Sequence, residues 1–242
     1  MKLLFTITIG FLCTATVCFS QERIKGLDGR LYVNVDGQKV VAEDVKGSQY
    51  YNENFLYAFV NENKSNPHKL RYNAYTDEME FERDGKLYDL EKGLYKVIDF
   101  DVALNKKYIY AEYVYNDETI KGYLVELASG EYKLYKREKM EFIPERKSTP
   151  SGFGKSDTPA EFRPAKNIYF LKIGDGQLIE IPNSKSKFTD LLNENQKAVS
   201  KFIKENNISL TDEKDLITLC ENLNNLYLSS SSSKSKESEL TQ

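Results

Sequence analysis

Residues Leu70 to Leu90 read LRYNAYTDEMEFERDGKLYDL, and they carry the clearest strand pattern in the chain. Apolar and polar side chains alternate on both sides of Asp84-Gly85, which is the pattern of paired strands that are half buried. A type I′ turn needs positive φ at both central residues, and Asp-Gly is a preferred pair for it. The stretch therefore predicts three short antiparallel strands, at residues 70–75, 78–83 and 86–90.

These turns imply a register. The Asp84-Gly85 turn pairs Phe81 with Tyr88, Met79 with Leu90, Glu80 with Asp89 and Glu82 with Leu87. If Thr76-Asp77 closes the first hairpin, Tyr72 faces Phe81, Ala74 faces Met79, Asn73 faces Glu80 and Arg71 faces Glu82. Thr-Asp is a poor type I′ pair, so the second hairpin is the better determined of the two. One face is then apolar (Tyr72, Ala74, Met79, Phe81, Tyr88 and Leu90), and the other is polar (Arg71, Asn73, Glu78, Glu80, Glu82 and Asp89).

The flanking sequence continues the strand pattern on both sides. Further strands are predicted at residues 30–35, 39–45, 52–60, 95–100, 107–115, 120–127, 131–135, 140–143, 167–173 and 177–181. Seventeen Tyr and thirteen Phe suit pleated, half-buried surfaces. The chain is therefore predicted to be mainly β (α+β), with an antiparallel meander that forms a barrel or a sandwich and a helical hairpin at its C-terminal end.

From Lys185 the apolar period changes from two to 3.6. The first predicted helix carries Phe188, Leu191, Leu192, Ala198, Val199, Phe202 and Ile203 on one face and stops at Asn206-Asn207. Ser209 or Thr211 caps the second, whose stripe is Leu216, Leu219, Cys220, Leu223, Leu226 and Tyr227. Both faces need a partner, and the sheet is the expected one.

The first twenty residues have the pattern of a secretory signal peptide, with Lys2, an apolar run from Leu3 to Val17, and small residues before Gln21. Cys18 leaves a lipoprotein as the alternative, but the residues before it do not fit that motif. No later segment is apolar enough to span a membrane. The protein is therefore expected to be exported, to the periplasm or outside the cell. Cys220 is the only cysteine beyond the signal peptide, so we expect no disulfide.

Composition divides the chain into five parts. They are a signal peptide (1–20), an antiparallel β domain (21–143), a Pro/Gly-rich loop (144–165), a β-hairpin with two amphipathic helices (166–228) and a disordered Ser-rich tail (229–242).

The sequence lacks the residues that several kinds of catalytic, metal and nucleotide sites require. The single histidine, His68, lies in a predicted loop, and Cys220 lies on an apolar helix stripe. Zinc sites of His and Cys therefore lack ligands, and the glycine-rich nucleotide loops and the calcium loop are missing. We expect no cofactor, no metal and no catalytic residue. The formal net charge of −3 gives no electrostatic reason to expect nucleic acid.

The one remaining constellation is on the polar face. Arg71, Asn73, Glu80, Glu82 and Asp89 form the candidate ligand-binding residues. Charge runs are usually solvated, so a solvent-facing surface is the expected reading. The alternatives are a site for a hard cation, or paired carboxylates for glycoside hydrolysis.

The pattern from Leu70 to Phe81, the Asp-Gly-Lys turn, Gly122-Tyr123 to Leu127 and Leu134-Tyr135-Lys136 resembles a group of small exported β-rich proteins of Gram-negative bacteria. Phe202-Ile203-Lys204, Asp215-Leu216-Ile217 and Leu223-Asn224 are similar to their endings. The group has no established activity, so the resemblance implies export and a shared fold and assigns no residue a role.

The leading hypothesis is a non-enzymatic binding or interaction module of the cell envelope, with an envelope protein or a glycan as its partner. The alternatives are a glycan-active hydrolase with paired carboxylates, and a structural subunit of an envelope assembly that docks through its helical hairpin.

Overall fold

The computed structural model describes residues 23–25, 31–33, 45–61, 63–147, 157–192 and 194–239. The predicted signal peptide lies outside these residues, as do the middle of the Pro/Gly-rich loop and the end of the Ser-rich tail. Among the described residues, no helix is both long and apolar enough to cross a membrane.

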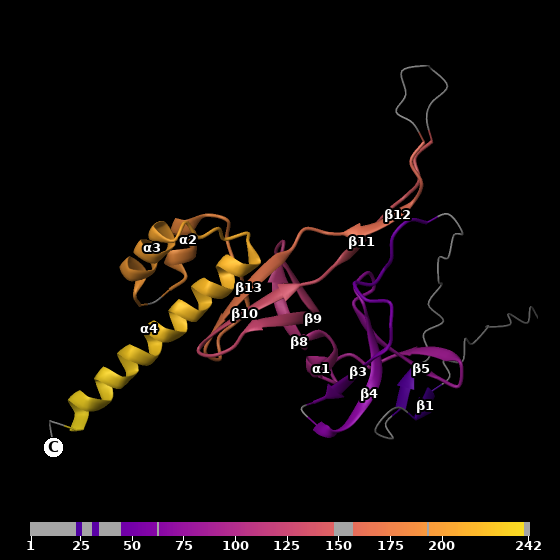
Figure 1. Ribbon diagram of the computed structural model, residues 1–242, viewed down its shortest axis with the longest axis horizontal. Helices are drawn as coiled ribbons and strands as arrows, with labels where there is room; N and C mark the ends of the chain where they lie inside the picture. Colours follow the sequence, from indigo (N-terminus) through magenta and orange to yellow (C-terminus); the bar gives the residue numbers. More distant parts are fainter. Residues whose placement is uncertain are drawn as a thin grey trace, which may run out of the picture.

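The main element is a ten-stranded, curled antiparallel sheet (Figure 1). Its strands, in spatial order, are β14 (Ile179–Glu180), β13 (Ile168–Ile173), β10 (Tyr132–Arg137), β9 (Glu118–Ala128), β8 (Lys107–Tyr115), β7 (Val97–Asp99), β3 (Leu56–Val60), β4 (Asn63–Asn73), β5 (Glu78–Arg83) and β6 (Lys86–Asp89). Neighbours in this order are mostly neighbours in sequence, which is the meander that the sequence predicts. The prediction of a mainly β fold is confirmed.

Two further pairs of strands lie beside this sheet. Strands β1 (Arg23–Lys25) and β2 (Leu31–Val33) pair with each other. Strands β11 (Met140–Ile143) and β12 (Glu161–Pro164) form a ribbon that projects from the main body (Figure 1). The ribbon is fastened at its base, where the N–H of Met140 donates to the carbonyl of Ala74.

Side chains on both faces of the sheet are buried. On one face, strands β3 to β9 bury a tyrosine-rich cluster that includes Tyr72, Tyr108 and Tyr123. Further along the same face, β10 and β13 bury Leu134 and Leu171 against the helices. The opposite face holds a smaller cluster of Tyr113, Leu124, Tyr135, Phe170 and Leu178.

The register of the second hairpin is confirmed, and that of the first is wrong. Glu80 faces Asp89, Phe81 faces Tyr88 and Glu82 faces Leu87, with positive φ at Asp84 (53°) and Gly85 (71°). In the first hairpin, however, Arg71 faces Glu80, Tyr72 faces Met79 and Asn73 faces Glu78. The turn is longer than Thr76-Asp77, because Asp77 has a φ of 62° and its N–H donates to the carbonyl of Asn73. The shift is two residues, so every side chain stays on its predicted face.

The helical end differs in detail from the prediction. The first predicted helix is divided into two helices, α2 (Lys185–Asp190) and α3 (Gln196–Glu205). The helix cannot continue through Asn195, because its backbone has the left-handed conformation with a φ of 62°. The stop at Asn207, with a φ of 51°, is as predicted. The cap of α4 (Glu213–Glu239) is Asp212 instead of Ser209 or Thr211, since its Oδ1 accepts from the N–H groups of Lys214 and Asp215.

Helix α4 runs across strands β10 and β9 and buries Leu216, Leu219, Cys220 and Leu223 against the sheet (Figure 1). It continues to Glu239, so residues 229–239 are helical where the sequence predicts disorder. Helix nucleation is the unfavourable step, and adding residues to an existing helix avoids it. The polar residues 229–239 can therefore be helical as a continuation of the packed part of α4. The remaining helix, α1 (Asp101–Leu104), is a single turn between β7 and β8.

Candidate functional site

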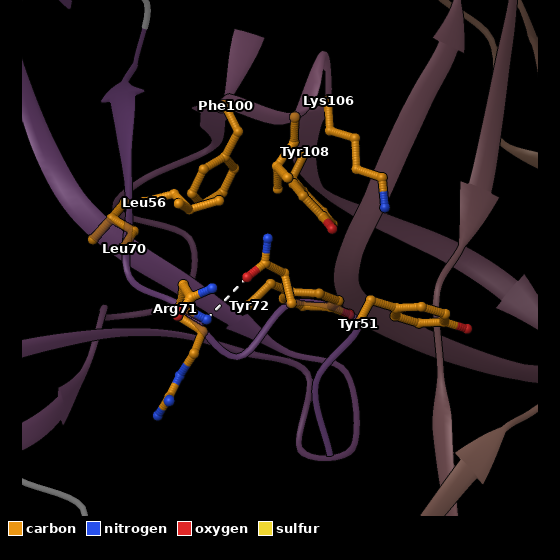
Figure 2. Close-up of a pocket in the computed structure, with 11 residues that line it drawn as sticks. Tyr51, Leu56, Leu70, Arg71, Tyr72, Phe100, Lys106 and Tyr108 are labelled. Carbon is orange, nitrogen blue, oxygen red and sulfur yellow. Dashed lines mark hydrogen bonds between the residues drawn. The ribbon is translucent and has the colours of Figure 1, made fainter. Parts of the chain in front are cut away.

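A cavity of about 110 Å³ opens where β3, β4 and the start of β8 meet helix α1. We call it the tyrosine pocket. Its lining residues are Tyr51, Asn52, Asn54, Leu56, Leu70, Arg71, Tyr72, Phe100, Leu104, Lys106 and Tyr108. Figure 2 shows Leu56, Leu70 and Phe100 on one side of the cavity, with Lys106 and Tyr51 on the other. The pocket thus has an apolar wall and a polar wall.

The apolar wall is part of the core. Leu70 is 0% exposed and Phe100 is 2% exposed, and the Phe100 ring meets the Tyr108 ring edge to face at 5.9 Å between centroids. Leu56 and Leu104 are partly buried against the same cluster. This wall is held in place by the sheet, so the apolar part of the cavity is formed before any ligand arrives.

The polar wall contains Lys106, whose ammonium nitrogen lies 5.6 Å from the centre of the Tyr51 ring. The Tyr51 side chain is at the rim, and its hydroxyl donates to the carbonyl of Lys139. Asn52 and Asn54 also line the pocket, and the Oδ1 of Asn52 accepts from the N–H of Asn54 at 2.9 Å. Amide, phenol and ammonium groups therefore surround an apolar interior.

Glu138, just outside this wall, anchors it. The side chain is only 3% exposed and accepts from Lys106 Nζ and from the Tyr108 hydroxyl, each at 2.7 Å, while Lys136 Nζ lies 3.3 Å away. Burial acts to raise the pKa of Glu138, but Lys106 and the hydrogen bonds from Lys106 and Tyr108 lower it overall. Burial and the Glu138 carboxylate both raise the pKa of Tyr108 well above its ordinary range. These shifts favour the ionised form of the Glu138 carboxyl and the neutral form of the Tyr108 hydroxyl.

Of the residues predicted from the polar face, Arg71, Asn73 and Glu80 do meet, but in the interior. Arg71 donates to Glu80 Oε2 from Nη2 at 2.6 Å and from Nε at 3.0 Å, and Asn73 donates to Oε1 at 2.9 Å. The Tyr50 hydroxyl lies within 3.1 Å of both carboxylate oxygens. The expectation of a solvent-facing surface is wrong here, because Glu80 is 4% exposed.

The guanidinium of Arg71 is enclosed by aromatic rings. Its central carbon lies 3.9 Å from the centre of the Tyr50 ring and 4.4 Å from that of Phe55. Arg71 also donates to the carbonyl of Glu53 at 3.0 Å. Although Arg71 belongs to the pocket lining, its side chain points away from the cavity in Figure 2. The Arg71–Glu80 pair therefore fastens residues 50–55 onto β4 and β5.

The other two predicted residues, Glu82 and Asp89, do not take part in this ion pair. Glu82 is exposed. Asp89 lies opposite Glu80 in the ladder, and burial together with Glu78 and Glu80 raises its pKa to about 7. Lys92 opposes that shift and forms an ion pair with Glu78 at 2.7 Å. The alternative of a hard cation between the carboxylates is disfavoured, because Arg71 already supplies a positive charge to Glu80.

The pocket itself was not predicted from the sequence. Lys106 and Glu138 stand in different segments of the chain, and each has charged neighbours in the sequence, which is the pattern of a solvated surface. The only usable signal was the density of tyrosines in 107–115, which indicates a half-buried surface but not which partners it has.

The described residues contain no group of three or more His, Cys, Asp or Glu side chains that could hold a metal ion. Cys220 is buried and donates to the carbonyl of Tyr132, and burial and Glu221 raise the pKa of its thiol to about 12. A thiol with so high a pKa is a poor nucleophile, so Cys220 acts in packing.

No family model, no curated protein and no solved structure matches the chain.

Proposed function

We propose that the protein is an exported, non-enzymatic binding module, and that the tyrosine pocket receives one apolar side chain of a protein partner. The observation that supports this most is the combination of a preformed apolar wall with a rim of hydrogen-bonding groups. Interfaces between proteins have this anatomy, in which a buried anchor is surrounded by polar contacts that exclude water.

The size of the cavity supports a side chain over a whole small molecule. Its volume of about 110 Å³ is below the range of about 300–1,000 Å³ in which drug-sized ligands bind. It is of the order of the engineered cavities of about 150 Å³ that accept a benzene ring. A leucine, methionine or phenylalanine side chain fits this scale, with its peptide backbone meeting the amides of Asn52 and Asn54.

The titratable groups at the pocket favour binding over catalysis. Glu138 is engaged by Lys106 and Tyr108, and proton transfer in a reaction would need to break these contacts first. Asp89 alone supports the alternative of glycoside hydrolysis, because a pKa of about 7 suits a general acid. Its cross-strand partner Glu80, however, has both oxygens occupied by Arg71, Asn73 and Tyr50. A nucleophile needs a free oxygen, so the binding module is the better supported function.

The test is a selection of short random peptides on the immobilised protein. Peptides that bind should share one apolar residue, and changing that residue to Ala should weaken binding at least tenfold. Leu56→Phe fills the cavity from its apolar wall and should weaken the same peptides at least tenfold, whereas Val114→Phe adds the same ring at an exposed position of β8 and should not. Peptides that bind Leu56→Phe as well as the unchanged protein would place the partner elsewhere.

Export is a separate part of the proposal, supported by the pattern of residues 1–20. The expected mature chain begins at Gln21 and carries no lipid. Intact mass of the protein from its native host tests this, and a diacylglycerol on Cys18 would contradict it.

A further inference from the structure

A second hollow, of about 410 Å³, lies between the ends of β8, β10 and β13, strand β14, the base of the β11–β12 ribbon and the segment before α4. We call it the basic groove. Its lining residues are Tyr115, Arg137, Lys139, Glu141, Ala165, Lys166, Asn167, Ile168, Tyr169, Glu180, Ile181, Asn183, Leu210 and Thr211. We propose that the basic groove is a binding site for a carboxylated sugar, separate from the tyrosine pocket.

The charge of the groove points to an anion. Among the described residues, Arg137 and Lys166 form no ion pair. Lys139 donates to the carbonyl of Tyr75, and burial and Arg137 lower its pKa. Unpaired cations that share a groove repel one another, and an anion between them relieves that repulsion.

The acidic residues of the groove do not cancel this charge. Two carboxylates line the groove, those of Glu141 and Glu180. The Glu141 carboxylate is paired with Arg163 at 2.8 Å, so only Glu180 is left to offset the positive charge. The groove therefore has more positive than negative groups available to a ligand. Arg137 is suited to a carboxylate in particular, because a planar guanidinium matches the two oxygens of that group.

The rest of the lining points to a hydroxylated ligand. Asn167, Asn183 and Thr211 supply amide and hydroxyl groups that both donate and accept, as sugar hydroxyls require. Arg137 lies 5.0 Å from the centre of the Tyr115 ring, which fixes the guanidinium against an aromatic face. The volume is within the range of small-molecule sites, unlike that of the tyrosine pocket. One groove thus presents a place for the carboxylate and places for the hydroxyls.

Glucuronate, a sugar with a carboxylate, tests the proposal directly. Glucose, which has the hydroxyls without the carboxylate, and acetate, which has the carboxylate without the hydroxyls, are the controls. In a titration followed by amide chemical shifts, glucuronate should bind the full chain at least tenfold more tightly than either, with shifts at Asn167 and Asn183. Acetate that binds as tightly as glucuronate would show an unspecific positive patch and overturn the proposal. So would glucose that binds equally well, or the absence of any saturable shift.

Two variants locate the site. Arg137→Gln should weaken glucuronate at least tenfold, and Lys166→Gln, at an exposed position, should weaken it several-fold without affecting the core. Lys201→Gln removes an equal charge from α3, outside the groove, and should leave the affinity unchanged. Equal losses in all three variants would mean that only net charge matters and would overturn the proposal. Because Leu56→Phe blocks the tyrosine pocket alone, glucuronate should still bind that variant, which separates this site from the proposed function.

Discussion

The guanidinium of Arg71 and the carboxylate of Glu80 lie 2.6 Å apart, with their side chains 13% and 5% exposed. An ion pair withdrawn from water to this degree depends on its further hydrogen bonds, and Asn73 and Tyr50 supply them. The pair links β4 to β5 and both to residues 50–55. Arg71 itself belongs to the lining of the tyrosine pocket, so loss of the pair should disturb its neighbours Leu70 and Tyr72, which line the same pocket.

Glu80→Gln should therefore destabilise the fold, by about 3 kcal/mol, because it leaves the Arg71 charge buried without its partner. Urea unfolding of both proteins measures this difference. Glu82→Gln, at an exposed position two residues further along β5, should change the free energy of unfolding by less than about 0.5 kcal/mol.

Calcium should alter neither result, since Arg71 already supplies the positive charge beside Glu80. If Glu80→Gln were less stable than the wild type only when calcium is present, the result would support the alternative of a cation site at Glu80.

For the hairpin of β4 and β5, the sequence predicted correctly which face of the sheet each side chain lies on, but not which residues pair across the strands. Alternation has a period of two, so a shift of two residues exchanges cross-strand partners and leaves Tyr72, Met79 and Phe81 on the buried face. The turn was the weak point, because a single left-handed Asp77 ends a longer loop than the expected Thr76-Asp77 pair.

The burial of Glu80 could not be predicted from local pattern at all. The rings that cover Arg71 belong to Tyr50 and Phe55, which precede the hairpin and have no periodic relation to it. Glu138 is a similar case, since its partners Lys106 and Tyr108 come from about thirty residues earlier. A sequence pattern describes which face a strand buries, and contacts between distant segments decide which charges are enclosed there.

Gly122 should not tolerate a methyl group. A Cβ at this position would lie 2.5 Å from Oδ2 of Asp77, whose Oδ1 accepts from the N–H of Tyr123 and from the hydroxyl of Tyr72. We expect Gly122→Ala to cost about 1–3 kcal/mol, as overpacking usually does. Thermal or urea unfolding measures it.

Asp77→Gly is the matched partner, because glycine removes the carboxylate and accepts the φ of 62°. In that background Gly122→Ala should cost less than about 0.5 kcal/mol. Costs that simply add would mean that the two residues do not interact and that the turn does not rest on β9.

Leu219→Ala should cost about 2–5 kcal/mol, because this side chain is 1% exposed between α4 and the sheet. Phe202→Ala, on α3, is only partly buried and should fall in the lower part of that range. Thr218→Ala, next to Leu219 on the exposed side of α4, should change stability by less than about 0.5 kcal/mol. Losses below about 0.5 kcal/mol for both apolar variants would mean that the helices do not share the core of the sheet.

Asp89 gives the fold a dependence on pH whose sign can be worked out. Burial, with the Glu78 and Glu80 carboxylates, raises its pKa from 3.8 to about 7 in the folded protein. Between these two values the folded chain holds a proton that the unfolded chain releases. The stability that Asp89 contributes is therefore greatest at low pH and is lost as the pH rises through 7.

Asp89→Asn keeps the shape of the side chain and removes its titration. At pH 8 it should stabilise the protein by about 1 kcal/mol, a figure reduced to allow for solvent at this partly exposed group. At pH 4 the two proteins should unfold almost alike, because the wild-type carboxyl is then protonated when folded. The difference between the two unfolding curves, measured from pH 4 to pH 8, isolates Asp89 from Asp77 and Glu78, whose pKa values burial also raises. Asp190→Asn, at an exposed position of α2, should show no such trend. A difference for Asp89→Asn that stays constant over this range would show that Asp89 is not held protonated by its neighbours.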